Sequence, residues 1–249
     1  MSEHVHVTDD GPIRMVRMNR PEKKNALTLP MYAAMAAAIE SIDRKTTRCM
    51  LLAGAPGAFS AGNDLQDFLK AAQTGEGLGE PILQFLYALV RCEVPIVAAV
   101  EGLAVGIGTT MLFHCDYVVA SHEARFSTPF VQLGLVPEAA SSLTAPRLLG
   151  HRRAFSLLVM GRPMDSQEAL SAGLVNAVVA ASEVETHAGK SAREIAAMPP
   201  EAVSASRRLM RGSPEDLVRR IDEEAELFKA RLTSSEARTA FETFLLRKR

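Results

Sequence analysis

The feature that most constrains the fold is a regular alternation between short apolar runs and longer segments of helical length. The apolar runs have the length and residue types of β-strands, and they fall at residues 13–18, 49–54, 95–100, 116–121 and 174–179. Helices are expected at residues 28–42, 81–91, 106–114, 139–149, 151–160 and 166–172. Because strands that alternate with helices are joined by crossovers, this pattern predicts an α/β core whose strands run mainly parallel.

The pattern changes after about residue 195. Strand signals stop there. Three successive helical segments follow, at residues 199–212, 213–232 and 234–249. Ser213 and Ser234 stand at the starts of the last two segments and are expected as N-caps. We therefore divide the chain into a core, residues 1–195, and a helical region, residues 196–249, whose amphipathic helices need an apolar partner for their buried face.

Composition and charge narrow the classes of function. Hydrophobic residues make up 47% of the chain and charged residues 23%, as in globular proteins with a sizeable core. The formal net charge is -1, so no general basic field would attract nucleic acid. The sequence lacks a basic segment followed by an apolar run at its start, and it lacks a window of about 18 apolar residues. We expect a cytoplasmic protein whose partners include neither nucleic acid nor a membrane.

The cysteines and histidines favour neither thiol nor metal chemistry. Cys49, Cys92 and Cys115 lie far apart, lack C-x-x-C spacing and have mostly apolar neighbours, which predicts reduced, buried thiols. The six histidines show no H-x-x-x-H or H-E-x-x-H pattern. No metal site is therefore expected, and we interpret His114, in "LFHCDYVV", as a core histidine.

One arrangement of strand, glycine-containing turn and helix occurs twice. The first copy is "CMLLAGAPGAFSAGNDLQDF", residues 49–68, and the second is "PIVAAVEGLAVGIGTTMLF", residues 95–113. Each would place unpaired backbone N–H groups at the start of a helix, and two such ends that converge on one carbonyl oxygen would form an oxyanion hole. The simpler alternative, that the glycines only permit tight turns and close packing, stays open. Nucleotide binding has less support, because "GIG" lacks the third glycine of G-x-G-x-x-G.

A single carboxylate stands out in "VPEAASSLT", residues 136–144. Glu138 is surrounded by alanines, serines and aliphatic residues, so no neighbour in sequence could neutralise its charge. It is either a solvated acid near the start of a helix, stabilised by the helix dipole, or a buried group whose pKa is raised towards that of a general base. The residues around Glu138 leave both interpretations open.

Five segments, taken in order along the chain, resemble the crotonase, or enoyl-CoA hydratase/isomerase, superfamily. They are "MNRPEKKNALT", "GAFSAGNDL", "VPIVAAVEGLAVGIGTTMLFHCDYVVAS", "ARFSTPFVQLGLVPEAASS" and "DSQEALSAGLVNAVV". The resemblance covers nearly the whole chain and implies a crotonase-like spiral of ββα repeats followed by a C-terminal helical region. It further implies an acyl-CoA thioester as substrate and assembly into trimers or hexamers. Coenzyme A is part of that substrate, so no separate cofactor is expected.

The resemblance also assigns the residues of the site. The backbone N–H groups of Asn63 and Ile107 match the family's pair of donors to the thioester oxygen, and their side chains are expected to matter little because the donors are main-chain groups. Other positions at which members contact the substrate are Lys24, Ala26, Ser60, Ala61, Gly62, Asp64, Leu65, Gly106, Thr110 and Phe130. Two of these have a simpler alternative: Lys24 as a solvated lysine, and Asp64 as a helix-start acid that supports its loop.

Two departures from the family pattern bear on the reaction. Hydratases of the family hold and activate water with two glutamates, and here those positions carry Thr110 and Phe130, which transfer no proton at neutral pH. Glu138 instead matches the one glutamate of Δ3,Δ2-enoyl-CoA isomerases, which moves a proton between C2 and C4 of the acyl chain. A single carboxylate in an apolar, water-poor pocket favours isomerisation over the addition of water.

The resemblance therefore predicts an enoyl-CoA isomerase of fatty-acid β-oxidation that works through a thioester dienolate. Residues 1–195 are expected to bind and convert the substrate, and residues 196–249 to serve as a lid, as a trimerisation element, or as both. Three alternatives remain open: hydration with a relocated base, another crotonase reaction such as thioester hydrolysis or dehalogenation, and acyl-CoA binding without catalysis.

Overall fold

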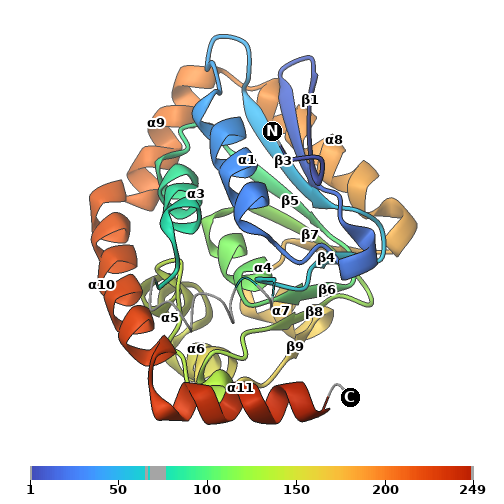
Figure 1. Cartoon of the computed structure of the whole chain (residues 1–249). Coiled ribbons are helices and arrows are strands. Elements are labelled where there is room, and N and C mark those ends of the chain that lie inside the picture. Colours follow the sequence, from blue (N-terminus) through green and yellow to red (C-terminus); the bar gives the residue numbers. More distant parts are fainter. Residues whose placement is uncertain (1, 65–66, 68–76, 248–249) are drawn as a thin grey trace.

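The computed structural model describes residues 2–64, 67 and 77–247 of the 249-residue chain. Leu65, one of the expected substrate contacts, lies outside the described residues. Two β-sheets with helices packed around them make up the described part (Figure 1).

The larger sheet carries the strands that the apolar runs predict. Its order is β1-β2-β3-β5-β7-β10, with β1 antiparallel to β2 and all other neighbours parallel. The strands are β1 (Val5–Asp10), β2 (Ile13–Met18), β3 (Cys49–Gly54), β5 (Ile96–Val100), β7 (Tyr117–Ser121) and β10 (Ala177–Val179). The sequence pattern does not predict β1, and it starts β10 three residues too early. The parallel pairing of the central strands confirms the α/β class.

A second sheet accompanies the first. Its order is β4-β6-β8-β9, formed by β4 (Ala58–Ser60), β6 (Leu103–Val105), β8 (Arg125–Ser127) and β9 (Met164–Asp165). Along the chain β4 follows β3, β6 follows β5 and β8 follows β7, so that a long strand of the larger sheet leads each time into a short strand of the second. This succession of strand pairs is the ββα repetition that the resemblance implies.

Helices cover both faces of the larger sheet. The α-helices of the described residues are α1 (Leu29–Glu40), α3 (Glu80–Arg91), α4 (Ile107–Thr110), α5 (Ser141–Leu149), α6 (His151–Leu158), α7 (Ser166–Ala172), α8 (Val184–Ala196), α9 (Pro200–Arg211), α10 (Pro214–Leu232) and α11 (Ser235–Arg247). On one face, Ala188 and Ala192 of α8 share an apolar cluster with Val97 and Val119 of the sheet. The opposite face is covered by α1 and α3 (Figure 1). The sequence pattern does not predict α8, and the single helix expected at 106–114 is divided into α4 and a 3-10 helix, Met111–His114.

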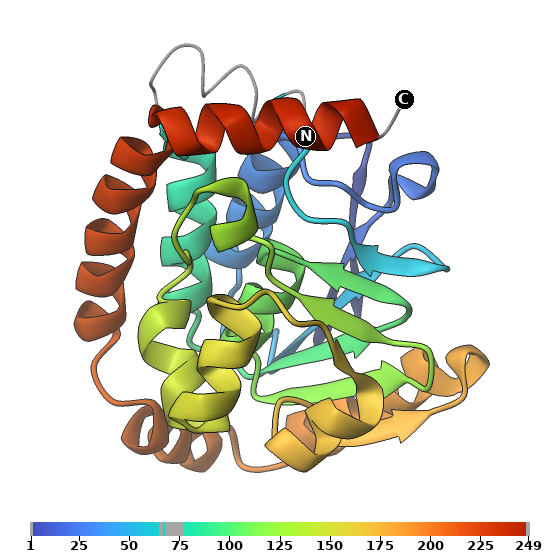
Figure 2. The same cartoon turned by 90° about the horizontal axis from the view of Figure 1, so that it is seen from below.

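The C-terminal helical region consists of α9, α10 and α11, as expected. The Ser213 hydroxyl accepts a hydrogen bond from the Glu215 N–H and the Ser234 hydroxyl accepts one from the Ala237 N–H, which confirms both predicted N-caps. Helix α10 contacts α3, and α11 crosses one end of the molecule (Figure 2). In the described part of the chain, no helix is long and apolar enough to cross a membrane.

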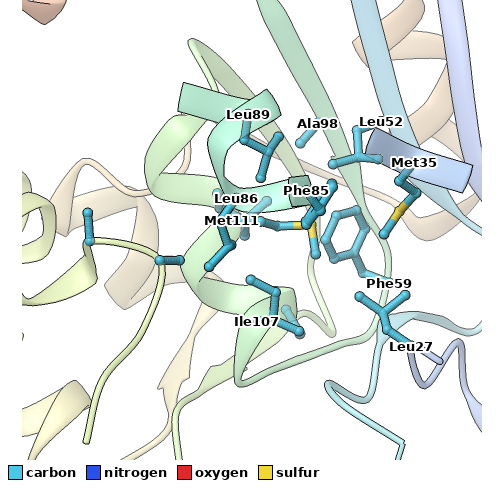
Figure 3. Packing of buried hydrophobic residues seen from close by; sticks show 14 of the residues in the cluster. Leu27, Met35, Leu52, Phe59, Phe85, Leu86, Leu89, Ala98, Ile107 and Met111 are labelled. Atoms are coloured by element: carbon cyan, nitrogen blue, oxygen red, sulfur yellow. The ribbon is translucent and has the colours of Figure 1, made fainter. Parts of the chain in front are cut away.

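The main core reaches as far as the start of α4. Figure 3 shows Ile107 and Met111 beside Phe59 and Phe85, and these side chains are almost completely buried. Phe59 belongs to β4, and Ile107 is the first residue of α4. The two glycine-containing junctions are therefore both anchored in the same core.

Candidate active site

The first junction is fixed by hydrogen bonds from its own loop to the segment before α1. The buried Ser60 hydroxyl donates to the Asn25 carbonyl at 2.9 Å and accepts from the Gly62 N–H at 3.1 Å. The Ala61 N–H donates to the Lys24 carbonyl at 2.9 Å. Lys24 thus contributes its main-chain carbonyl to the junction, although Lys24 is an exposed residue.

In the first junction, the backbone N–H of Asn63 points away from the segment that contains Leu27. Leu27 donates its N–H to the Gly62 carbonyl and accepts the Asp64 N–H at its own carbonyl, both at 2.8 Å. In such a parallel bridge the N–H of the middle residue points to the opposite side. No acceptor for the Asn63 N–H is found among the described residues, so this donor is available to a ligand.

The Asn63 side chain also makes a contact, contrary to the expectation that its identity matters little. Its Oδ1 accepts a hydrogen bond from the hydroxyl of Tyr32, a fully buried residue of α1. Burial raises the pKa of Tyr32 well above its usual range, and the charge of Glu138 adds to this effect, so Tyr32 remains a protonated donor. Tyr32 could not be predicted from the sequence, because a tyrosine inside a helical segment has no local signal for such a contact.

Asp64 supports the loop through an ion pair. The Arg20 Nη1 donates to the Asp64 Oδ2 at 2.6 Å, and the exposed fractions of the two side chains are only 15% and 12%. The same Arg20 nitrogen donates to the Ala26 carbonyl at 3.1 Å. This contact agrees with the interpretation of Asp64 as a structural acid. Arg20 itself stands in the quoted "MNRPEKKNALT" segment, which was the available signal for it.

The second junction is formed by main-chain geometry at the start of α4. Gly106 has a φ of 55° and is the N-cap of α4, and its carbonyl accepts the N–H groups of Thr109 and Thr110. Ile107 is the first helical residue, and an N–H at this position has no acceptor within its own helix. Phe130 borders the turn, since a Cβ atom placed on Gly106 would lie 4.0 Å from its ring.

The two junctions are in direct contact with each other. A Cβ atom placed on Gly62 would lie 2.8 Å from the carbonyl oxygen of Val105, and one placed on Gly108 would lie 2.9 Å from that of Ser60. Both distances are too short for a side chain, so glycine is needed for close packing at both positions. The packing interpretation and the donor interpretation of these glycines are thus compatible, because this packing brings the loops that carry Asn63 and Ile107 together.

Glu138 lies beside α4 and is buried. It is only 1% exposed, so the interpretation as a solvated surface acid is wrong. Its Oε1 accepts a hydrogen bond from the Thr110 hydroxyl at 2.5 Å, whereas its buried Oε2 has no partner among the described residues. Burial raises the pKa of Glu138 to about 8; the Thr110 hydrogen bond acts against this rise, and the Glu224 charge adds to it. A carboxyl group with this pKa can accept and return a proton near neutral pH.

The residues that follow Glu138 have a strained backbone. Ala139 and Ala140 have φ values of 60° and 53°, in the left-handed region that residues with a side chain seldom adopt. The Ala139 carbonyl lies 2.7 Å from the Nε2 of His114. Burial lowers the pKa of His114 to about 4, so the ring is neutral and its Nε2–H is the donor to this carbonyl. His114 is therefore a core histidine, as expected, with a structural contact to the Glu138 loop.

A second buried carboxylate supports the same loop. Glu224 of α10 accepts the Ala140 N–H at 2.6 Å and the Ser142 N–H at 2.9 Å, one at each oxygen. Glu224 is hard to single out in the sequence, because α10 is rich in charged residues. A signal existed, since Glu224 falls at helical spacing on the buried stripe formed by Leu217, Ile221 and Phe228.

The other reactive side chains give no support for thiol or metal chemistry. Cys49 and Cys92 are buried, and burial raises the pKa of Cys49 to about 12, which keeps this thiol protonated. Within residues 2–64, 67 and 77–247, no three histidine, cysteine, aspartate or glutamate residues are grouped so that they could hold a metal ion.

Comparisons with known proteins agree with this arrangement. The sequence profile of the enoyl-CoA hydratase/isomerase family matches residues 9–249. Enoyl-CoA delta isomerase 2 of Rattus norvegicus is 34% identical, over 99% of this chain and 64% of that protein, so the chain spans slightly less than two thirds of that relative. Carnitinyl-CoA dehydratase of Salmonella agona (strain SL483) is 33% identical over 86% of this chain and 83% of that protein. The crystal structure of an enoyl-CoA hydratase/isomerase from Pseudoalteromonas atlantica T6c is 39% identical and superimposes with a TM-score of 0.91 over 98% of both chains. The chain belongs to the enoyl-CoA hydratase/isomerase family.

Proposed function

We propose that this protein is an acyl-CoA-processing enzyme and that it catalyses the isomerisation of 3-enoyl-CoA to 2-enoyl-CoA. The observation that carries the proposal is Glu138, a buried carboxylate held beside α4 with a pKa of about 8, one oxygen of which has no partner among the described residues. The similarity of the whole chain to a rat protein named as an enoyl-CoA delta isomerase supports the same reaction. The similarity of the chain to a dehydratase supports only the broader statement, that the protein processes acyl-CoA.

In the proposed mechanism, the thioester oxygen accepts hydrogen bonds from the N–H groups of Asn63 and Ile107. These donors stabilise the negative charge that develops on the oxygen and make the C2 proton more acidic. Glu138 removes this proton through its free oxygen, which gives a dienolate, and the same carboxyl group returns a proton to C4. The C3–C4 double bond is lost and a C2–C3 double bond forms, with no net gain or loss of atoms.

The residues around Glu138 favour this reaction over hydration. Thr110 stands where hydratases of the family carry one glutamate, and its hydroxyl donates to Glu138. Phe130 stands where they carry the other, and it is an almost completely buried apolar side chain next to Gly106. A pair of acids that would hold a water molecule is therefore replaced by a hydrogen-bond donor and an aromatic ring, and a water-poor pocket suits proton transfer between two carbons.

The proposal is tested by incubating the purified protein with a 3-enoyl-CoA of medium chain length and following the ultraviolet absorbance of the conjugated product. Glu138→Gln should reduce kcat by about 1000-fold, because it removes the only proposed proton carrier while keeping the side-chain shape. Glu123→Gln is the matched control, since it makes the same change at an exposed glutamate, and should leave kcat unchanged.

Mass spectrometry of the products separates the proposal from its alternatives. With 2-enoyl-CoA supplied as a separate substrate, a 3-hydroxyacyl-CoA product without any conversion of 3-enoyl-CoA would indicate hydration, and free coenzyme A from either substrate would indicate thioester hydrolysis. Tight acyl-CoA binding without any product would identify a binding protein. Each of these results, or full activity of Glu138→Gln, would contradict the proposed isomerisation.

A further inference from the structure

Glu224 connects the C-terminal helical region to the loop that carries Glu138. It is only 5% exposed, and both of its carboxylate oxygens accept backbone N–H groups of that loop. Burying a charged group is costly unless it is hydrogen-bonded. The two N–H donors offset part of this cost, so Glu224 is a specific partner of the loop.

The contact falls on the strained part of the loop. Ala140, one of the two residues with a left-handed backbone, donates its N–H to Glu224 at 2.6 Å. The left-handed conformation is unfavourable for alanine and persists where the surrounding structure holds it. Glu224 on one side and His114 on the other supply polar contacts that hold this turn.

We propose that Glu224 is a positioning residue whose carboxylate fixes the left-handed Ala139–Ala140 turn and thereby directs the Glu138 side chain towards Thr110 and α4. This inference rests on the proposed role of Glu138 as the base. It gives the C-terminal helical region a direct part in the site, because a residue of α10 sets the geometry of the carboxylate that carries the proton.

Glu224 also acts on Glu138 through its charge. The groups that face Glu138 are Tyr32 from α1, Thr110 from α4 and Glu224 from α10, while the neutral His114 contacts its loop. Arg207 and Arg211 of α9 act on His114, and Arg220 acts on Glu224 from within α10. Among these groups, the Glu224 charge raises the pKa of Glu138. Removing that negative charge makes ionisation of Glu138 easier, so the pKa of Glu138 should fall.

The test compares three variants at two glutamates of α10. Glu224→Gln keeps the side-chain shape but removes the charge and one of the two acceptors. Glu224→Asp keeps the charge on a shorter side chain. Glu226→Gln, at an exposed position of the same helix, is the matched control.

The kinetics are measured with 3-enoyl-CoA as substrate. Glu224→Gln should lower kcat by about tenfold or more with little change in KM, and it should shift the acidic limb of the kcat profile to lower pH. Glu224→Asp should recover part of kcat and leave the limb near its original position.

A measurement without substrate keeps this inference separate from the proposed function. The carboxyl carbon of Glu138 is followed by NMR in protein labelled with 13C-glutamate, and its signal is assigned by its absence in Glu138→Gln. The pKa of Glu138 should fall in Glu224→Gln and stay unchanged in Glu226→Gln. This result is readable even if the wild-type protein does not convert 3-enoyl-CoA, in which case only the proposed function fails.

One further variant covers the possibility that Glu224→Gln does not fold. Glycine adopts the left-handed conformation without strain, so Ala140→Gly combined with Glu224→Gln should restore folding and show the same fall in the pKa of Glu138. A folded Glu224→Gln, or the folded double variant, whose Glu138 titration and kcat equal those of Glu226→Gln would overturn the inference.

Discussion

The two strand-to-helix junctions each present one backbone N–H, but they are built from different parts. The junction after β4 depends on polar side chains: Ser60 within the loop, Tyr32 bonded to Asn63, and the Arg20–Asp64 ion pair. The junction after β6 is formed mainly by the main chain, with a glycine of positive φ as the N-cap of α4, and the buried Thr109 hydroxyl adds one hydrogen bond to the Ala104 carbonyl at 2.6 Å.

This difference shows that a donor can be oriented in two ways. At a helix start, the geometry of the helix itself leaves the N–H free. In an irregular loop, the N–H is directed only if other groups hold the chain on both sides of it. We therefore expect the first junction to be sensitive to the loss of single polar groups, and the contact between the junctions to be sensitive to added atoms.

Among changes within the two junctions, the largest effect is expected from Gly62→Ala, which adds an atom between them. The new Cβ would lie 2.8 Å from the Val105 carbonyl, at a φ of 86°. Displacing the Asn63 donor should lower kcat/KM by about 100-fold. Gly57→Ala is the matched control, because its φ of 94° imposes similar backbone strain, while no atom of the described residues lies within 4 Å of the added Cβ. Equal losses of activity in the two variants would contradict the steric explanation.

The next effect concerns Glu138, beside the second junction, and the pH dependence of the free energy of unfolding. Burial raises the pKa of Glu138 from its usual value of 4.5 to about 8, so between these pH values the folded protein binds one more proton than the unfolded chain. Wild-type stability should therefore fall as pH rises through this range, and Glu138→Gln should escape this loss. One pKa unit corresponds to about 1.4 kcal/mol, so the variant should gain a few kcal/mol relative to wild type between pH 5 and pH 9.

Urea unfolding of both proteins at the two pH values checks this prediction. Glu224 also has a raised pKa, but it is present in both proteins, so its contribution largely cancels in the difference. A stability difference that does not change with pH would mean that Glu138 is solvated in the folded protein.

A smaller effect is expected from Tyr32→Phe, which breaks the side-chain support of Asn63. The lost hydrogen bond should cost about 1 kcal/mol of stability, and kcat/KM should fall about fivefold because the first donor is held less firmly. Tyr87→Phe is the control, since it removes a tyrosine hydrogen bond to Asp222 on α10. A loss of activity in the control that matches Tyr32→Phe would show that the effect is not specific to the junction.

The smallest effect is expected from Ser60→Ala. The hydroxyl makes two hydrogen bonds within the first junction, but the Ala61 and Leu27 main-chain contacts still hold the loop. We expect a loss of about 1 kcal/mol in the free energy of unfolding, measured in urea, and a decrease in kcat/KM of less than about threefold. A larger decrease in kcat/KM than in Tyr32→Phe would reverse the order of importance proposed for this junction.

The sequence predicts most of the long elements of the fold, but it misses β1, α8 and the short strands. The central strands β3, β5 and β7 are continuous apolar runs, which mark a fully buried strand. In contrast, β4, β6 and β8 have only three residues each, too few to show a period. Helix α8 packs on the sheet through Ala188 and Ala192, and such small residues give only a weak apolar pattern.

The residues of the site likewise differ in whether the nearby sequence identifies them. Asn63, Ile107 and Glu138 follow from the resemblance, because each lies in a short motif. Glu224 does not, because its contact with Ala140 spans 84 residues of sequence and depends on how α10 packs. The coenzyme A contacts at Lys24 and Ala26, the division at residue 195, the trimer or hexamer and the cytoplasmic location stay predictions.

The most direct test of the central claim is to follow the transferred hydrogen itself. A 3-enoyl-CoA that carries deuterium at C2 is converted in ordinary water under single-turnover conditions, and the 2-enoyl-CoA product is examined by mass spectrometry and NMR. If the buried Glu138 moves the proton alone, part of the deuterium should be found at C4. A product with no deuterium at C4 would contradict a one-base transfer in a water-poor pocket.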